Sequence, residues 1–253
     1  CSLREAIYKA EDSTGPDEIT FNLSGTINLT VSLPYILNMA DITINGEGQS
    51  IIIDGSTSNQ VFYVASGASL LLQNISITNG FVFSDGNLSL SEFKLYRTER
   101  NDISSLSANQ IPVIFSQEKK LIDDESEPCY IQSGESLWLS GEITDCSIYS
   151  ESDITITGST FINSNSYNQG NLTIEGSTLT NSSLGNAGDQ TISQSHFFEC
   201  QLNNQGDMDI TLSDFTSSWA HNISSQGNLS FSNSSFSNDQ EGHIYGHDSI
   251  EYI

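Results

Sequence analysis

The second half of the chain repeats itself with a period of about 18 residues. From Ser152 the sequence divides into three units of 18 residues, followed by one of 21 and one of 14. A unit this short has room for strands and turns but for no helix that could cover them, so its apolar side chains must be buried against neighbouring units. Four positions of the unit keep the same kind of residue: the second is Asp or Asn, the fifth Ile or Phe, the eighth Ser and the tenth Phe or Leu. These columns are Asp153, Asn171, Asp189, Asp207 and Asn228; Ile156, Ile174, Ile192, Ile210 and Phe231; Ser159, Ser177, Ser195, Ser213 and Ser234; and Phe161, Leu179, Phe197, Phe215 and Phe236.

Within each unit apolar and polar residues alternate, as in Ile154 and Ile156, which is the periodicity of a β-strand. Stacked units place equivalent strands roughly 4.8 Å apart, so each column of like residues packs on itself and a continuous core forms. Gly with Asp or Asn at the start of each unit is expected to supply left-handed or turn conformations between the strands. The repeat therefore predicts an all-β fold, a single-stranded parallel β-helix (solenoid).

The same pattern extends toward the N-terminus and predicts one β-helix domain over residues 1–253. Residues 134–151 form another 18-residue unit, so regular coils are expected over residues 134–240, with longer coils nearer the start. Over residues 95–133 the repeat lapses, and five of the seven basic residues lie between positions 94 and 120. We expect this segment to be an insertion or protruding loop, a kind of segment that often carries function.

The first twelve residues differ from the rest and predict a helix. Ser2 and Glu5 have the spacing of a capping box, and an apolar stripe of Leu3, Ala6, Ile7 and Ala10 follows with helical periodicity. A β-helix has open strand edges at its ends, and an uncovered edge invites pairing with other chains. We therefore expect residues 1–12 to form an N-terminal capping helix.

Charge limits the partners that the chain can have. Its formal net charge is −25, and residues 121–253 contain 19 acidic residues and no Lys or Arg. Such a surface repels nucleic acids and polyanionic glycans. No stretch approaches 18 uninterrupted apolar residues, so no membrane-spanning helix is expected. Cations, and ligands that tolerate negative charge, remain possible.

The N-terminal third also carries a resemblance to a known family. The stretch CSLREAI, followed by DEITFNLSGTINLTVSLPYI, ADITINGEGQSIIIDG and VFYVASGASLLLQNISITNG, covers about residues 1–80. It resembles the CSLREA-type domain of large bacterial surface proteins, which is related to the pectin-lyase-like right-handed parallel β-helices of polymorphic outer-membrane proteins and filamentous adhesins. The resemblance implies a right-handed helix, an extracellular or cell-surface location and membership of a longer chain, and it implies no reaction.

A lyase site is expected only where the chain has cations, and residues 121–253 have no Lys or Arg. Enzymes on this fold act mostly on acidic polysaccharides, as lyases that need cations to neutralise a uronate or as glycosidases that need paired carboxylates. The candidate binding residues are Lys94, Tyr96, Arg97 and Arg100, beside the predicted insertion. The groups near the end of the chain, His243, Tyr245, His247 and Asp248, lack the spacing of a known signature, and we read them as polar tail residues.

Three further features have both a structural and a functional interpretation. Asp153, Asp189 and Asp207 of the second column could bind Ca²⁺, a cation that prefers oxygen ligands, although turn preference alone explains Asp and Asn there. Outward-facing Thr155, Thr173 and Thr191 could bind ice, but Asp209 interrupts the row. Cys146 and Cys200 lie three units apart and cannot pair. A Cys129–Cys146 bond remains open, although free buried thiols are favoured.

Together these features favour a non-enzymatic extracellular β-helix of a bacterial surface or secreted protein, serving adhesion or surface display. The expected partner is a host-cell or matrix surface, through a protein or a neutral glycan. The alternatives are a polysaccharide-active enzyme with its site near residues 95–133, and a solenoid face that binds ice or another ligand. No cofactor is expected apart from the Ca²⁺ considered above.

Overall fold

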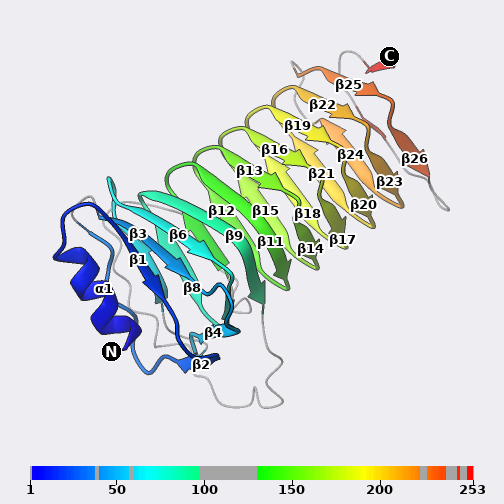
Figure 1. Cartoon of the computed structure of the whole chain (residues 1–253). Helices are drawn as coiled ribbons and strands as arrows, with labels where there is room; N and C mark the ends of the chain where they lie inside the picture. Colours follow the sequence, from blue (N-terminus) through cyan, green and yellow to red (C-terminus); the bar gives the residue numbers. More distant parts are fainter. Residues whose placement is uncertain are drawn as a thin grey trace, which may run out of the picture.

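The structure of the chain, a computed structural model, consists of one short helix followed by strands that wind around a common axis (Figure 1). It describes residues 2–37, 40–56, 60–96, 130–222, 227–237, 244–245 and 250–252. Every strand pairing among these residues is parallel. The predicted parallel β-helix is therefore confirmed.

Each coil contributes one strand to each of three faces. Face 1 consists of β1 (Pro16–Thr20), β3 (Asp41–Asn45), β6 (Ser69–Gln73), the first half of β9 (Asn87–Tyr96), the first half of β11 (Leu137–Thr144), β13 (Ile154–Thr157), β16 (Leu172–Glu175), β19 (Gln190–Ser193), β22 (Met208–Thr211), β25 (Leu229–Ser232) and β28 (Ile250–Tyr252). Face 2 consists of β2 (Gly25–Asn28), β4 (Ile51–Asp54), β7 (Ile75–Thr78), the second halves of β9 and β11, β14 (Thr160–Ile162), β17 (Thr178–Thr180), β20 (His196–Phe198), β23 (Asp214–Thr216) and β26 (Ser235–Ser237).

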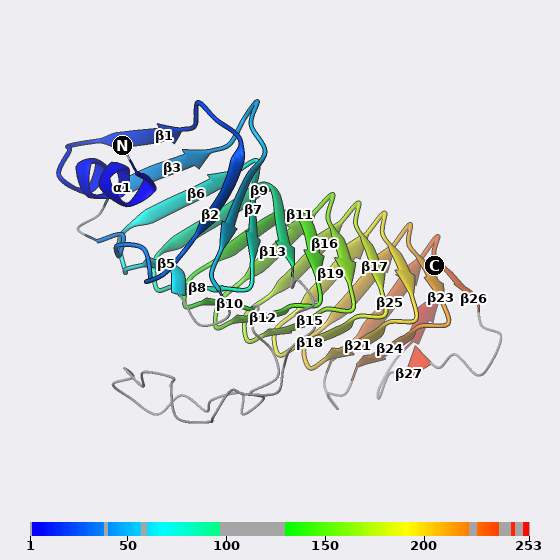
Figure 2. The same cartoon turned by 90° about the horizontal axis from the view of Figure 1, so that it is seen from below.

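Face 3 is a separate nine-stranded sheet, whereas β9 and β11 run across a corner and join faces 1 and 2 into one sheet. The strands of face 3 follow one another along one side of the molecule (Figure 2). They are β5 (Gln60–Val64), β8 (Phe81–Ser84), β10 (Tyr130–Ser133), β12 (Ser147–Ser150), β15 (Asn165–Asn168), β18 (Ser183–Asn186), β21 (Gln201–Asn204), β24 (Trp219–Asn222) and β27 (Ile244–Tyr245).

The register of the strands reproduces the columns of the repeat. Ile156, Ile174, Ile192, Ile210 and Phe231 pair in succession on face 1, and all five are buried. On face 2 the rings of Phe197, Phe215 and Phe236 stack with centroids 4.5 Å apart, close to the strand spacing. Like side chains therefore pack on like along the axis, and this stacking builds the core.

Two of the three corners share a two-residue design, a residue with positive φ followed by a buried small residue. Between faces 1 and 2 the first position is Gly158, Gly176, Gln194, Leu212 and Asn233 in successive coils. The second position is the serine column, in which the backbone N–H of Ser159 donates to Ser177 Oγ at 3.1 Å, and the contact recurs from coil to coil. The corner between faces 2 and 3 repeats the design with Asn163 and Ser164, and with Asn181 and Ser182.

The glycines that start the units have another role than the one predicted. Gly170, Gly188 and Gly206 do not have positive φ; left-handed residues lie at the other two corners. A Cβ at Gly188 would lie 2.4 Å from the carbonyl oxygen of Gly170, and one at Gly206 would lie 2.5 Å from that of Gly188. Glycine is required here because the backbones of successive coils approach closely. Of the two predicted conformations, the left-handed one is wrong at the unit start, whereas the chain does bend at Gln169 and Gly170.

The N-terminal helix α1 (Leu3–Glu11) confirms the predicted cap. The Ser2 hydroxyl accepts from the backbone N–H of Glu5, whose carboxylate accepts from the backbone N–H of Ser2. Leu3, Ile7 and Ala10 are buried in the common core, and the helix contacts β1 at the first coil (Figure 1). No described helix is long and apolar enough to cross a membrane.

The segment predicted as an insertion starts at the corner between faces 2 and 3. Strand β9 ends at Tyr96 and β10 begins at Tyr130, so the first two and last four of residues 95–133 are strand residues, and the predicted bounds are too wide. Residues 97–129 lie outside the described residues. In the later coils the same corner takes two residues, such as Asn163 and Ser164.

The cysteines follow the prediction in part. Cys200 is a buried free thiol in the column of Ser164, Ser182 and Ser218, and burial raises its pKa. Cys146 is disulfide-bonded, so the prediction of a free thiol there is wrong. The other cysteine of that bond lies outside the described residues. Cys146 and Cys200 do not pair with each other, as the spacing predicted.

Candidate functional site

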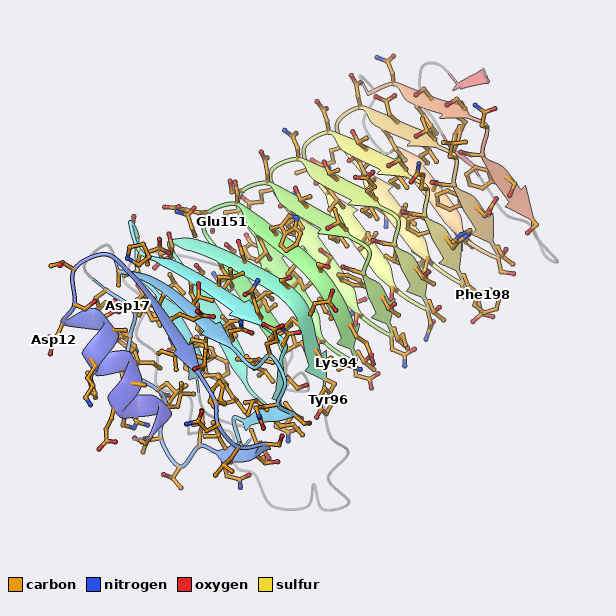
Figure 3. All side chains as sticks on the ribbon, in the orientation of Figure 1. Asp12, Asp17, Lys94, Tyr96, Glu151 and Phe198 are labelled. Atoms are coloured by element: carbon orange, nitrogen blue, oxygen red, sulfur yellow. The ribbon has the colours of Figure 1, made fainter. Side chains whose placement is uncertain are left out.

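Lys94 and Tyr96 lie together at the end of β9 on face 2 (Figure 3). Lys94 Nζ contacts Glu142 Oε2 of the next coil at 2.8 Å, and this hydrogen bond with its charge attraction raises the pKa of Lys94. The ammonium group is thus neutralised by a neighbour in the chain and is not directed at an open acid-binding site. The other two predicted residues, Arg97 and Arg100, lie outside the described residues.

The aspartates proposed as calcium ligands form a ladder with the protein backbone. Asp189 Oδ1 accepts from the backbone N–H of Asp207 at 2.9 Å, and Asp207 Oδ1 accepts from that of Asn228 at 2.8 Å. Asp153 accepts in the same way from Asn171, which separates it from Asp189 by one coil. Among the residues that the structure describes, no three His, Cys, Asp or Glu side chains are grouped to hold a metal ion. The carboxylates of this column accept hydrogen bonds from backbone N–H groups of the next coil and so hold successive coils together.

The threonine row on face 1 consists of three residues from three successive coils; we call the strand that one coil contributes to a face a rung of that face. Thr155, Thr173 and Thr191 pair in register, and the next rung is Asp209. The adjacent outward column holds Thr157, Glu175, Ser193 and Thr211. The carboxylate of Asp209 accepts a hydrogen bond from the Ser230 hydroxyl, so a charged group interrupts the row.

Face 3 has a property that the sequence analysis missed. None of its nine strands contains Asp, Glu, Lys or Arg, although the chain carries 32 acidic residues. Its outward side chains are aromatic rings, amides and hydroxyls, among them Tyr63, Phe81, Phe83, Tyr149, Asn165, Tyr167, Ser183, Gln201, Asn203 and Trp219. The signal in the sequence was the lack of charge in the third strand of every unit, which becomes visible only when the coils are divided into three strands.

Two tyrosines on face 3 form a stacked pair, which we call the tyrosine platform. The rings of Tyr149 and Tyr167 lie 5.7 Å apart with an interplanar angle of 15°, and Gln169 Nε2 donates to Tyr149 Oη at 2.5 Å. The next rung after Tyr167 is Gly185, where a Cβ would come within 3.0 Å of Tyr167 Cδ2. The ring of Tyr167 therefore lies against the Gly185 backbone, and 43% of Tyr167 is exposed.

A second aromatic group lies on the same side at the first coils. Tyr35 and Tyr63 have ring centroids 4.9 Å apart, and Phe81 and Phe83 meet edge to face at 5.3 Å. Tyr63 Oη donates to Asp85 Oδ2 at 2.7 Å, and this bond, with partial burial, raises the pKa of Tyr63 to about 12. The raised pKa means that the hydroxyl keeps the proton that it donates to Asp85.

A groove of about 370 Å³ lies at the N-terminal end, between α1 and β1. Its lining mixes apolar and charged groups, among them Ala6, Lys9, Asp17 and Phe21. Helix α1 and β1 lie far along the axis from β12 and β15, the strands that carry the tyrosine platform (Figure 2).

The fold defines the class: the chain is a repeat protein with the architecture of a parallel β-helix. Comparison with family models, with curated proteins and with solved structures gives no match to any of them.

Proposed function

We propose that the chain is a non-enzymatic extracellular β-helix of a bacterial surface or secreted protein and that it serves adhesion or surface display. The resemblance of residues 1–80 to CSLREA-type domains of pectin-lyase-like surface proteins supports this function and its location. The observation that carries the adhesive role is face 3, an uncharged sheet with aromatic and amide side chains on a protein of net charge −25.

An uncharged face matters because the rest of the protein repels anionic surfaces. Acidic residues lie on faces 1 and 2 and at the corners, for example Glu175, Asp209 and Glu199. A partner that approaches face 3 meets no unpaired charge on the strands and loses little solvation of ions on contact. Aromatic side chains are enriched at the centres of binding surfaces, whereas charged residues are depleted there.

The alternative of a polysaccharide lyase beside residues 95–133 needs a free cation for the uronate carboxylate. Lys94, the described cation of that candidate site, is already paired with Glu142. This pair favours binding over chemistry as the role of the molecule, and it leaves the uncharged face as the stronger candidate site.

The experiment measures binding of the chain to panels of immobilised matrix proteins and glycans. We expect binding that falls at least about tenfold when acids are placed on face 3 by Asn165→Glu with Gln201→Glu, since tenfold corresponds to about 1.4 kcal/mol. Both positions are exposed. Thr178→Glu, at an exposed position of face 2 in the intervening coil, is the matched control and should leave binding unchanged.

Two results would overturn the proposal. One is release of new reducing ends or unsaturated sugars from a polysaccharide incubated with the chain, because the chain would then be an enzyme. The other is equal loss of binding in the face 3 and face 2 variants, since that would place the binding surface elsewhere.

A further inference from the structure

We propose that the tyrosine platform and the uncharged coils beside it form a binding site for neutral glycans. A pyranose ring stacks on the exposed side of Tyr167, and its hydroxyls bond to side chains of the neighbouring rungs. This inference rests on the proposed adhesive function and names the chemical class of its partner.

The first argument is that the ring of Tyr167 is both exposed and fixed. It is 43% exposed, yet it stacks on Tyr149 from one side and lies against the Gly185 backbone on the next rung. Tyrosine offers a rigid amphipathic surface with only two side-chain torsions to immobilise, so little conformational entropy is lost on binding. A platform that is preorganised in this way binds more tightly than a mobile side chain of the same area.

The second argument is the set of polar groups beside the ring. Asn165 precedes Tyr167 on the same face, and Ser183, Gln201 and Asn203 follow on the next two rungs. In the part of the chain that the structure describes, the side chains of Asn165, Gln201 and Asn203 are not engaged in hydrogen bonds. Each amide offers two donors and one acceptor oxygen, which matches sugar hydroxyls that both donate and accept.

The third argument is charge, which selects among sugars. The strands of face 3 offer no Lys or Arg for a carboxylate or sulfate, and residues 121–253 contain none. The nearest corners add acids, Asp145 before β12 and Glu199 before β21. A uronate or sulfated sugar would meet repulsion without a compensating cation, whereas a neutral sugar would not.

The composition of the face also favours a glycan over a protein partner. Beyond Tyr167 the outward residues of β18 and β21 are Ser183, Gly185, Gln201 and Asn203, none of which is apolar and large. A protein interface needs a desolvated apolar centre, and these rungs do not supply one. Two polar rungs between the exposed rings of Tyr167 and Trp219 suit a sugar chain lying along the solenoid axis.

The test measures binding of the whole chain to soluble neutral oligosaccharides (cello-, xylo-, manno- and laminari-oligosaccharides) by calorimetry, with polygalacturonate as the acidic probe. We expect binding to at least one neutral series and none to polygalacturonate. Tyr167→Ala should weaken that binding by at least about tenfold, a usual effect for an aromatic anchor, whereas Tyr167→Phe should retain it. Gly185→Ala, whose Cβ would crowd Tyr167 Cδ2, should weaken binding severalfold by displacing the ring.

The matched control is Phe198→Ala. Phe198 is an aromatic side chain on face 2 with a similar exposed fraction, 45%, and it points away from the solenoid (Figure 3). Its loss should leave glycan affinity unchanged. Thermal unfolding of each variant checks that the solenoid is intact.

The outcomes separate the two proposals. Binding to a neutral glycan that survives Tyr167→Ala, or that Phe198→Ala weakens equally, overturns the platform. Preference for polygalacturonate also overturns it. Binding to a matrix protein with no binding to any neutral glycan overturns the platform but leaves adhesion standing, whereas released sugar products would overturn adhesion itself.

Discussion

Polar side chains inside the solenoid fall into two groups, those that form ladders and those that do not. Asn186 Nδ2 donates to Asn204 Oδ1 at 2.7 Å, and Asn168 donates to Asn186 in the same way. Gln190 is different, since it is 1% exposed and neither Nε2 nor Oε1 has a hydrogen-bond partner among the described residues. It occupies a column that is otherwise apolar, with Leu172 before it and Met208 after it.

We predict that Gln190→Leu stabilises the protein. An unsatisfied buried amide costs about 1–3 kcal/mol, and leucine removes this cost and adds apolar burial. The free energy of unfolding, measured by urea denaturation, should rise by about 1–3 kcal/mol. The reverse change in the neighbouring coil, Leu172→Gln, should lower it. A Gln190→Leu variant no more stable than the original chain would contradict this explanation.

Among single residues, the columns could be predicted from the sequence and the left-handed positions could not. The stacked columns were visible because like residues recur at fixed spacing. The left-handed positions were not, because Gln194, Glu199 and Leu212 adopt positive φ although their side chains do not favour it. Neighbouring coils impose the corner geometry, and this tertiary effect overrides the local preference of each residue.

At the scale of elements, the stability of the cap helix depends on the hydrogen bonds at its N-terminus and on the burial of its apolar face. Nine residues make an isolated helix marginal, so most of its stability comes from packing. Leu3, Ile7 and Ala10 supply this packing, and the capping box fixes the start of the helix where the first backbone N–H groups lack partners.

We predict that Ser2→Ala destabilises the cap, by about 1 kcal/mol for loss of an N-cap hydroxyl. The pKa of Glu5 in the folded state is lowered first by the hydrogen bond from the Ser2 backbone N–H, which the variant keeps, and then by the Ser2 hydroxyl, which it loses. A lowered folded pKa contributes stability above the ordinary value of 4.5, and this stability is lost as the pH falls through the lower folded pKa. NMR titration of Glu5 should show its pKa moving up toward the ordinary value in the variant.

The control for this prediction is a change on the exposed side of the same helix. Tyr8 is 55% exposed and takes no part in the capping box, so Tyr8→Ala should leave the pKa of Glu5 where it is. An unchanged pKa of Glu5 in Ser2→Ala would mean that the Ser2 hydroxyl does not contribute to the lowered pKa, because alanine keeps the backbone N–H that donates to the carboxylate.

Most elements could be predicted, but their assignment to faces could not. The capping motif and the apolar stripe located the helix, and the alternation of apolar residues located the strands of the regular coils. The long strands β9 and β11 cross from face 1 to face 2, where the register shifts beside Gly141, and no sequence period marks this crossing. The tyrosine platform was missed for the same reason, since Tyr149, Tyr167 and Gly185 meet only once the third strand of each coil is aligned.

At the scale of the whole molecule, the dominant feature is the separation of charge from one face. The net charge is −25, and among the residues that the structure describes no acid lies on a strand of face 3. Coils with like charge lie one strand spacing apart, so the repulsion between rungs acts along the whole axis. The hydrogen-bonded ladders and the stacked core must outweigh this repulsion for the solenoid to remain folded.

We predict that salt stabilises the folded solenoid. Raising the ionic strength from 0.1 to 1 M shortens the Debye length from about 10 to 3 Å, less than the distance between rungs, so repulsion between carboxylates on neighbouring coils is screened. Each kcal/mol recovered should raise the Tm by about 2–4 °C for a chain of this size. Calorimetry in NaCl should therefore show the Tm rising steadily with concentration. Glu175→Gln, which removes an exposed acid from face 1, should raise the Tm at low salt and reduce its dependence on NaCl, because less repulsion remains to screen. A Tm that stays constant or falls with NaCl would show that repulsion between coils does not limit the stability of the solenoid.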